Sequence, residues 1–201
     1  MSSRDAARAR ARGFAYALGA YAIWGLIPVY FKLVAAAPAL ELLAHRVLWA
    51  FALLLPIGWR RDRFAELWRA LASRQVLFGL AASTVLLAVN WLIYIWAVYG
   101  SRIVEASLGY FLTPLVNVLL GVVALKERLE RPVAVALALA GLGVAWLTLA
   151  AARPPWIAVG LALSFGSYGL VRKLVRGVGA MAGLTVATAL LAPLALGYLA
   201  W

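Results

Sequence analysis

The chain is a succession of long apolar segments separated by short stretches that carry most of its charge. Each apolar segment is long enough, at ~1.5 Å of rise per helical residue, to cross the ~30 Å hydrocarbon core of a bilayer. The segments cover residues 13–34, 41–59, 75–99, 105–125, 132–151, 156–172 and 179–201. This pattern predicts an all-α integral membrane protein with about seven transmembrane helices.

The basic residues between the segments indicate how the chain is oriented. Most of the 19 Lys and Arg residues fall in four clusters, at residues 4–12, 60–74, 126–131 and 172–176. All four clusters lie on one side of the membrane if the chain crosses it at every segment. The positive-inside rule then predicts a cytoplasmic N-terminus, with residues 1–12 as a basic cytoplasmic arm. The net charge of +12 is explained in this way without a nucleic-acid partner.

Composition narrows the chemistry further. Hydrophobic residues make up 66% of the chain, whereas soluble domains average ~45–50%, so membrane lipid is the expected surrounding. Cysteine is absent and histidine occurs once, as His45, so we expect neither a metal site nor a cofactor. The motifs GxxxxGK[ST], GxSxG and HExxH are also absent. We therefore do not expect an enzyme.

Several apolar segments nevertheless carry polar and aromatic side chains on one helical face. In residues 105–125 this face holds Ser107, Tyr110, Pro114, Asn117 and Gly121. Comparable faces hold Tyr21, Trp24, Pro28 and Phe31, then Ser83, Asn90, Tyr94 and Ala97, then Ser164, Ser167 and Tyr168. A single stripe is explained by hydrogen bonding between helices, worth ~0.6–2 kcal/mol per contact. Four stripes together predict a pocket for a small-molecule substrate, lined by Tyr21, Trp24, Asn90, Tyr94, Tyr110, Asn117, Ser164 and Tyr168.

Two prolines fall within these faces. Pro28 and Pro114 lack an N–H and free the carbonyls of Trp24 and Tyr110. Freed carbonyls at membrane depth are tolerated beside a wet cavity, which predicts helix breaks at the pocket. A packing kink without function is the alternative.

Charged residues gather near the outer ends of three segments. They are Lys32, Glu41, His45, Arg46 and Glu105. One interpretation is interfacial anchoring, in which the long side chains extend to water. The other is an outer gate, in which Glu41 or Glu105 pairs with Lys32 or Arg46 and the pair separates when the cavity opens.

Two short sequences suggest an internal repeat. Residues 24–27 (WGLI) and 168–171 (YGLV) share an aromatic, glycine and two aliphatic positions. An odd number of segments separates their starts, so the two copies enter the membrane from opposite sides. Inverted repeats of this kind are typical of secondary transporters.

A set of longer motifs carries a family resemblance. The stretches AYAIWGLIPVYFKL, ELLAHRVLWA, NWLIYIWAV, EASLGYFLTPLVNVLLG, KERL and SYGLVRK together resemble the RarD branch of the EamA-type transporters, in the drug/metabolite transporter superfamily. The resemblance implies a bacterial inner-membrane permease with ten helices in two inverted five-helix repeats. Residues 13–151 would form the first repeat, and residues 156–201 the first two helices of an incomplete second repeat, so the expected fold is truncated there.

The expected function is secondary transport, with export of small metabolites or amphipathic drugs across the inner membrane. The alternative is a non-transporting membrane protein, or a truncated remnant that needs a partner chain. A homodimer would also satisfy that need.

Overall fold

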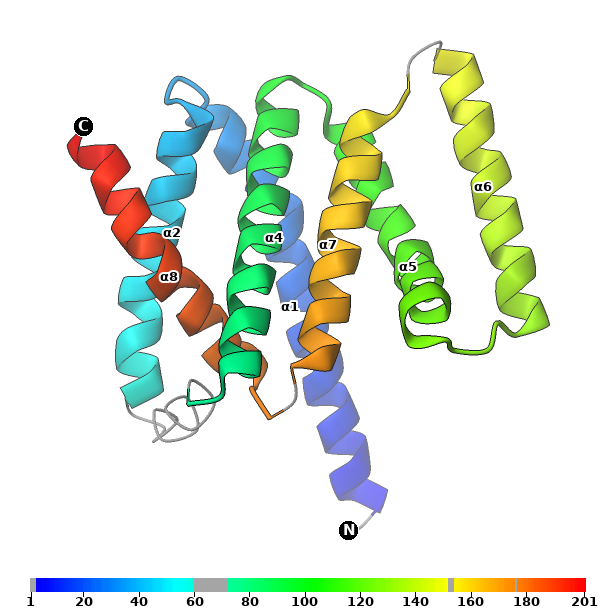
Figure 1. The fold of residues 1–201 in the computed structure, drawn as a ribbon, viewed down its shortest axis with the longest axis horizontal. Helices are drawn as coiled ribbons and strands as arrows, with labels where there is room; N and C mark the ends of the chain where they lie inside the picture. Colours follow the sequence, from blue (N-terminus) through cyan, green and yellow to red (C-terminus); the bar gives the residue numbers. More distant parts are fainter. Residues whose placement is uncertain (1–2, 60–71, 152–153, 176) are drawn as a thin grey trace. The chain divides into compact units, whose positions relative to one another are not determined.

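The computed structural model describes residues 3–59, 72–151, 154–175 and 177–201. The chain divides into two compact units, residues 1–37 and 38–201, and each is described by itself. Within the described residues all regular structure is helical, which confirms the all-α prediction. The helices are labelled as in Figure 1: α1 (Ser3–Leu33), α2 (Ala39–Trp59), α4 (Arg74–Tyr99), α5 (Ile103–Leu125), α6 (Arg131–Ala151), α7 (Trp156–Leu174) and α8 (Ala180–Ala200).

These helices occupy the seven predicted apolar segments, and most ends agree within two residues. The exception is α1, which begins at Ser3, inside the predicted basic arm. The arm is therefore not separate from the helix, because its Ala and Arg residues are strong helix formers. Among the described residues, six helices are long and apolar enough to cross a bilayer, and α6 has a shorter apolar stretch, Arg131–Trp146.

Within residues 38–201, α7 packs against both α4 and α5. The α4 and α7 helices are antiparallel, because Gly79 near the start of α4 meets Val175 just past the end of α7. The α5 and α7 helices are parallel. Their first turns are joined by a hydrogen bond from the Ile157 N–H to Glu105, and their far ends by an ion pair between Lys173 and Glu127.

The last helix, α8, completes this unit by packing against α2 and α4. At its start, Val178, Ala182 and Val186 surround the fully buried Leu80 of α4. Towards its end, Ala195 packs against Ala44 of α2 and its buried neighbours. Small side chains at these contacts let the helices approach closely, as is usual between membrane helices.

Buried hydroxyls in these helices bond mainly within their own helix. Thr84 donates to the Leu80 carbonyl at 2.8 Å, and Thr188 donates to the Leu184 carbonyl at 3.0 Å. Large apolar side chains face outward instead, with Phe111 81% exposed. This distribution suits a lipid environment, where an outer apolar surface is favourable and each buried polar group needs a protein partner.

The α5 and α7 backbones approach each other closely at Gly109. A Cβ placed on Gly109 would lie 2.8 Å from the Leu161 Cβ and 2.9 Å from the Ala158 carbonyl oxygen. These atoms are backbone or the first side-chain carbon, so they cannot move without moving α7. Gly141 on α6 is the opposite case, because nothing lies within 4 Å of its Cβ position.

Gly109→Ala is expected to lower the free energy of unfolding by ~1–3 kcal/mol, because the methyl group overpacks the α5–α7 contact. Gly141→Ala is the matched control, and it should leave stability unchanged or raise it by up to ~1 kcal/mol through helix propensity. Reversible unfolding in mixed micelles measures both. Equal stability of the two variants would contradict the close α5–α7 approach.

Candidate functional site

Asn90, Tyr110 and Ser164 form a hydrogen-bonded group between α4, α5 and α7, called the polar seam below. The Asn90 side chain is 1% exposed. Its Nδ2 donates to the Ser164 Oγ at 3.0 Å and to the Leu161 carbonyl at 3.2 Å. Its Oδ1 accepts a hydrogen bond from the Tyr110 hydroxyl at 3.0 Å. Both amide donors are therefore used, and the seam ties three helices together.

An aromatic row continues from the polar seam along α7. Tyr110 lies edge-on to Tyr94 of α4, with ring centroids 5.6 Å apart, and edge-on to Phe165 of α7 at 5.9 Å. Phe165 in turn stacks on Tyr168 at 5.6 Å. Such edge-to-face and offset arrangements are favourable and give an apolar wall with polar hydroxyl tips.

The charged residues near the other end of the helices have partners of their own. The Arg46 guanidinium lies 4.3 Å from the centre of the Trp91 ring, a cation–π contact between α2 and α4. Glu105 forms an ion pair with Arg102 at 2.6 Å, and its Oε1 accepts the Ile157 N–H at 2.9 Å. In this conformation Glu105 pairs with Arg102 and with the first turn of α7. The outer-gate hypothesis, in which either Glu41 or Glu105 pairs with Lys32 or Arg46, stays a prediction.

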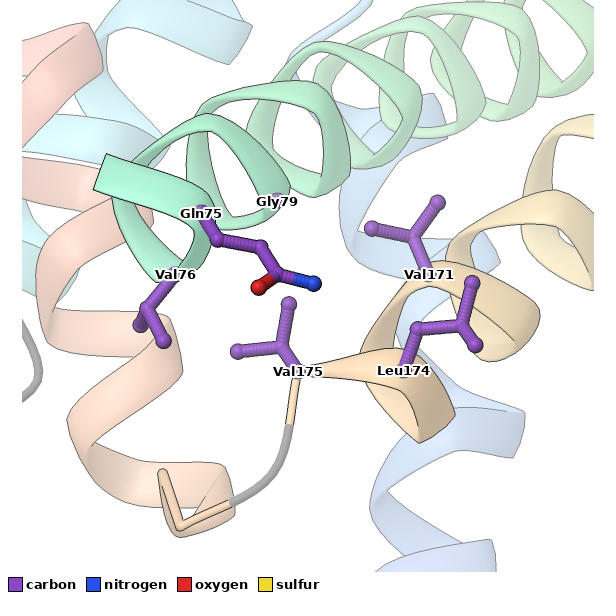
Figure 2. A pocket seen from close by; sticks show the side chains of 6 residues that line it. All are labelled: Gln75, Val76, Gly79, Val171, Leu174 and Val175. Carbon is purple, nitrogen blue, oxygen red and sulfur yellow. The ribbon is translucent and has the colours of Figure 1, made fainter. Parts of the chain in front are cut away.

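Two pockets flank the C-terminal part of α7. The first, the α4–α7 pocket, has a volume of about 490 Å³ and lies against the start of α4. Its walls are mostly aliphatic, and the Gln75 amide is its one polar side chain among the six in Figure 2. In that view the Gln75 side chain extends from α4 into the space bordered by Val171, Leu174 and Val175.

The second, the α5–α7 pocket, is smaller, at about 250 Å³. Asn117 and Lys173 contribute its polar side chains. Gly121 and Gly169 have no side chains, so they leave space between the facing surfaces of α5 and α7. The Asn117 Oδ1 lies 3.4 Å from the Cβ positions of both Gly166 and Gly169. A larger residue at either glycine would press on the amide.

The structure thus brings together five of the predicted lining residues. Asn90, Tyr110 and Ser164 form the polar seam, Tyr94 packs against Tyr110, and Tyr168 joins them through Phe165. Asn117 lines the α5–α7 pocket instead. The remaining candidates lie on α1, in the unit of residues 1–37: Tyr21, Trp24, Pro28 and Lys32.

Pro28 and Pro114 both lie inside continuous helices, and their predicted link to a cavity stays a prediction. Helix α1 runs from Ser3 to Leu33 through Pro28, and α5 runs from Ile103 to Leu125 through Pro114. Each proline removes one backbone N–H without interrupting its helix. On α5, Ser107 and Pro114 are exposed, and the face buried against α7 is instead that of Ala106, Gly109 and Thr113.

Two contributing residues were absent from the predicted set. Phe165 precedes Tyr168 by three positions on α7, a spacing that places both rings on one side of a helix and could have indicated the pair. Lys173 lies one turn beyond Gly169. In the sequence it belongs to the basic cluster at residues 172–176, which indicates orientation and not a pocket. Its contact with Glu127 has no signal in the sequence, since the two residues are far apart in the chain.

The helices and the polar groups between them define a multi-pass α-helical membrane protein. A profile of the EamA-like transporter family matches residues 11–149, and the chain belongs to that family, in the group that includes the RarD proteins. No solved structure matches the chain significantly.

Curated relatives match nearly the whole chain. It is 46% identical to an uncharacterised transporter of Pseudomonas aeruginosa, over 94% of this chain and 63% of that protein. It is 45% identical to protein RarD of Salmonella typhi, over 97% of this chain and 66% of the relative. Protein RarD of Escherichia coli is 44% identical, over 97% and 65%. The chain therefore spans somewhat less than two thirds of the length of these relatives.

A double-mutant cycle on the polar seam should show that its hydrogen bonds are coupled. Tyr110→Phe and Asn90→Ala are each expected to destabilise the protein, with a coupling of ~0.6–2 kcal/mol between them, because both remove the same bond. Unfolding in mixed micelles gives the four free energies. The exposed Tyr198 of α8 supplies the control, and Tyr198→Phe combined with Asn90→Ala should show no coupling. Additive effects at Tyr110 would mean that this bond is not formed.

Proposed function

We propose that this chain acts in secondary transport, moving small amphipathic metabolites or drugs outward across a bacterial inner membrane. Support comes from its membership of a transporter family and from the chemistry along α7. The relatives bear the names of transporters and of RarD proteins, one of them "chloramphenicol-sensitive", and those names are theirs.

The observation that carries the proposal is the Asn117 amide. Asn117 lies well within the span of α5 and lines the α5–α7 pocket. Among the described residues no hydrogen bond is found to its side chain. Asn117 is exposed, so its amide is accessible to a substrate, whose polar atoms would supply hydrogen bonds that lipid does not.

In this proposal the polar seam takes part in transport only after the helices around it move. Asn90 has its donors occupied in this conformation, so it reaches a substrate only if α4 and α7 shift. Tyr94, Tyr110 and Tyr168 supply the aromatic wall beside it.

No enzyme activity is part of the proposal, and neither a cofactor nor a metal is needed. The described residues contain no cluster of His, Asp or Glu suited to a metal ion. The chain is proposed to lie in the inner membrane with its N-terminus in the cytoplasm, on the distribution of basic residues.

A second candidate is a chain that functions only with a partner chain or a second copy. The observation in its favour is α6, where nothing lies within 4 Å of the Cβ positions of Gly141 and Gly143. Glycine surfaces of this kind allow close helix packing in a membrane.

Transport by the purified 201-residue chain in proteoliposomes tests the proposal directly. Labelled chloramphenicol, hippurate and N-methyl-4-phenylpyridinium provide a neutral, an anionic and a cationic aromatic probe. At least one should cross faster than in empty liposomes, and Asn117→Leu should slow it ~3- to 10-fold by removing a substrate hydrogen bond. Ser107→Ala is the control, because Ser107 is also exposed on α5 but does not line the α5–α7 pocket. If no probe crosses faster, the chain does not transport these classes alone and the partner-dependent candidate is preferred.

Topology offers an independent test of orientation. If all seven described helices cross the membrane, the N-terminus and Trp201 lie on opposite sides. A reporter that is active only in the cytoplasm should work when fused before Ser3 and be silent when fused after Trp201. Activity at both positions would mean that one helix does not cross, and α6 would be the first to examine.

A further inference from the structure

A carboxylate of the chain itself lies against two of the residues that line the α5–α7 pocket. The Glu127 side chain returns over α5, and its Oε2 lies 2.6 Å from the Cβ position of Gly121. Its Oε1 accepts a hydrogen bond from the Lys173 Nζ at 2.6 Å, across the pocket on α7. Gly121 and Lys173 both line that pocket. A carboxylate is thus already seated between a lysine and a bare glycine surface.

The backbone before Glu127 is shaped to hold it there. Lys126 ends α5 in the left-handed conformation, with φ of 55°, a region that favours glycine. The Glu127 N–H then bonds back to the Gly121 carbonyl at 3.2 Å. This turn directs the side chain over α5 rather than away into the loop.

The polar groups inside the pocket extend the same chemistry inward. Asn117 lies one helical turn before Gly121, and Gly169 lies one turn before Lys173, so the two helices present two matching layers. The outer layer holds the cation and the seated carboxylate. The inner layer holds an amide against a glycine, with no hydrogen bond to the amide among the described residues.

We propose that Glu127 is an internal stand-in for the acid group of a substrate, and that the α5–α7 pocket binds small amphipathic carboxylates. The substrate carboxylate replaces Glu127 on Lys173, its apolar part lies over Gly121 and Gly169, and the Asn117 amide bonds to its polar atoms. This inference rests on the proposed transport function and names the substrate class for it.

The size of the pocket and the exposure of the ion pair both suit this exchange. About 250 Å³ is below the ~300–1,000 Å³ typical of sites for drug-sized ligands, so the occupant is a small acid. The side chains of Lys173 and Glu127 are 61% and 51% exposed. An ion pair this exposed is weak, so an incoming carboxylate can displace Glu127 readily.

Binding of labelled benzoate to the whole chain in nanodiscs of neutral phosphatidylcholine tests the inference, because the two partners of the ion pair should act in opposite directions. Lys173→Gln should weaken benzoate binding about two- to fivefold, by removing the charged donor. Glu127→Gln should tighten it about two- to fivefold, by removing the internal competitor.

Three controls accompany these variants. Lys173→Arg keeps the cation and should retain binding, which separates the loss of charge from a loss of folding. Lys126→Gln removes a neighbouring charge and should have little effect. Benzamide, the neutral analogue of benzoate, should bind no tighter to Glu127→Gln than to the unmodified chain.

Weaker or unchanged binding in Glu127→Gln would overturn the inference, as would benzoate binding that is unchanged in Lys173→Gln. If phosphatidylglycerol in the nanodiscs abolishes benzoate binding, the site takes a lipid headgroup and the substrate class is wrong. Transport of only neutral or cationic probes, unaffected by Lys173→Gln, would also overturn the inference while leaving the transport proposal standing. If benzoate binding weakens in Lys173→Gln and tightens in Glu127→Gln but no probe is transported, the inference about the pocket stands and the transport proposal is wrong.

Discussion

A carboxamide buried between membrane helices must have its hydrogen bonds supplied by the protein, because the hydrocarbon around it offers none. Asn90 imposes that requirement on α4, α5 and α7 together. Sliding α4 by one turn along α7 would separate the amide from both of its acceptors, and a similar shift of α5 would remove Tyr110. The hydrogen bonds of this one side chain therefore constrain the register of all three helices, and the close approach at Gly109 and the aromatic row occur in that same register.

The two ends of the α5–α7 pair are held unequally. At one end Glu105 bonds to the backbone of the first turn of α7, where the helix dipole favours a negative charge, and Arg102 supports the same carboxylate. At the other end Glu127 and Lys173 meet in an exposed pair. The exposed pair contributes less, because water competes for both charges. Separation of α5 from α7 would therefore begin at the Lys173 end, next to the pocket, with the Glu105 end acting as the fixed point.

Sequence reasoning recovered the helices well because lipid allows few alternatives to a continuous helix. It placed the start of α1 too late, since charge marks where the membrane ends and not where the helix ends. On α5 it identified Tyr110 correctly as a residue facing other helices, yet it assigned Ser107 and Pro114 to the same face, and these are exposed. Periodicity gives the residues that share a face, but the neighbour that covers the face is set by tertiary packing. The partners of Asn90 and of Glu127 lie far along the chain, so no local pattern could indicate them.

The polar seam also has a consequence for the order in which the protein assembles. Helices enter the membrane in the order of synthesis, so α4 and α5 are present before α7 exists. In that interval Asn90 can accept from Tyr110, but both of its amide hydrogens lack their final acceptors. The pair of early helices is thus incomplete in hydrogen bonding until residues 161–164 have been inserted. A nascent α4–α5 hairpin is for that time a candidate for surveillance by membrane chaperones and proteases, and the emergence of α7 ends that exposure.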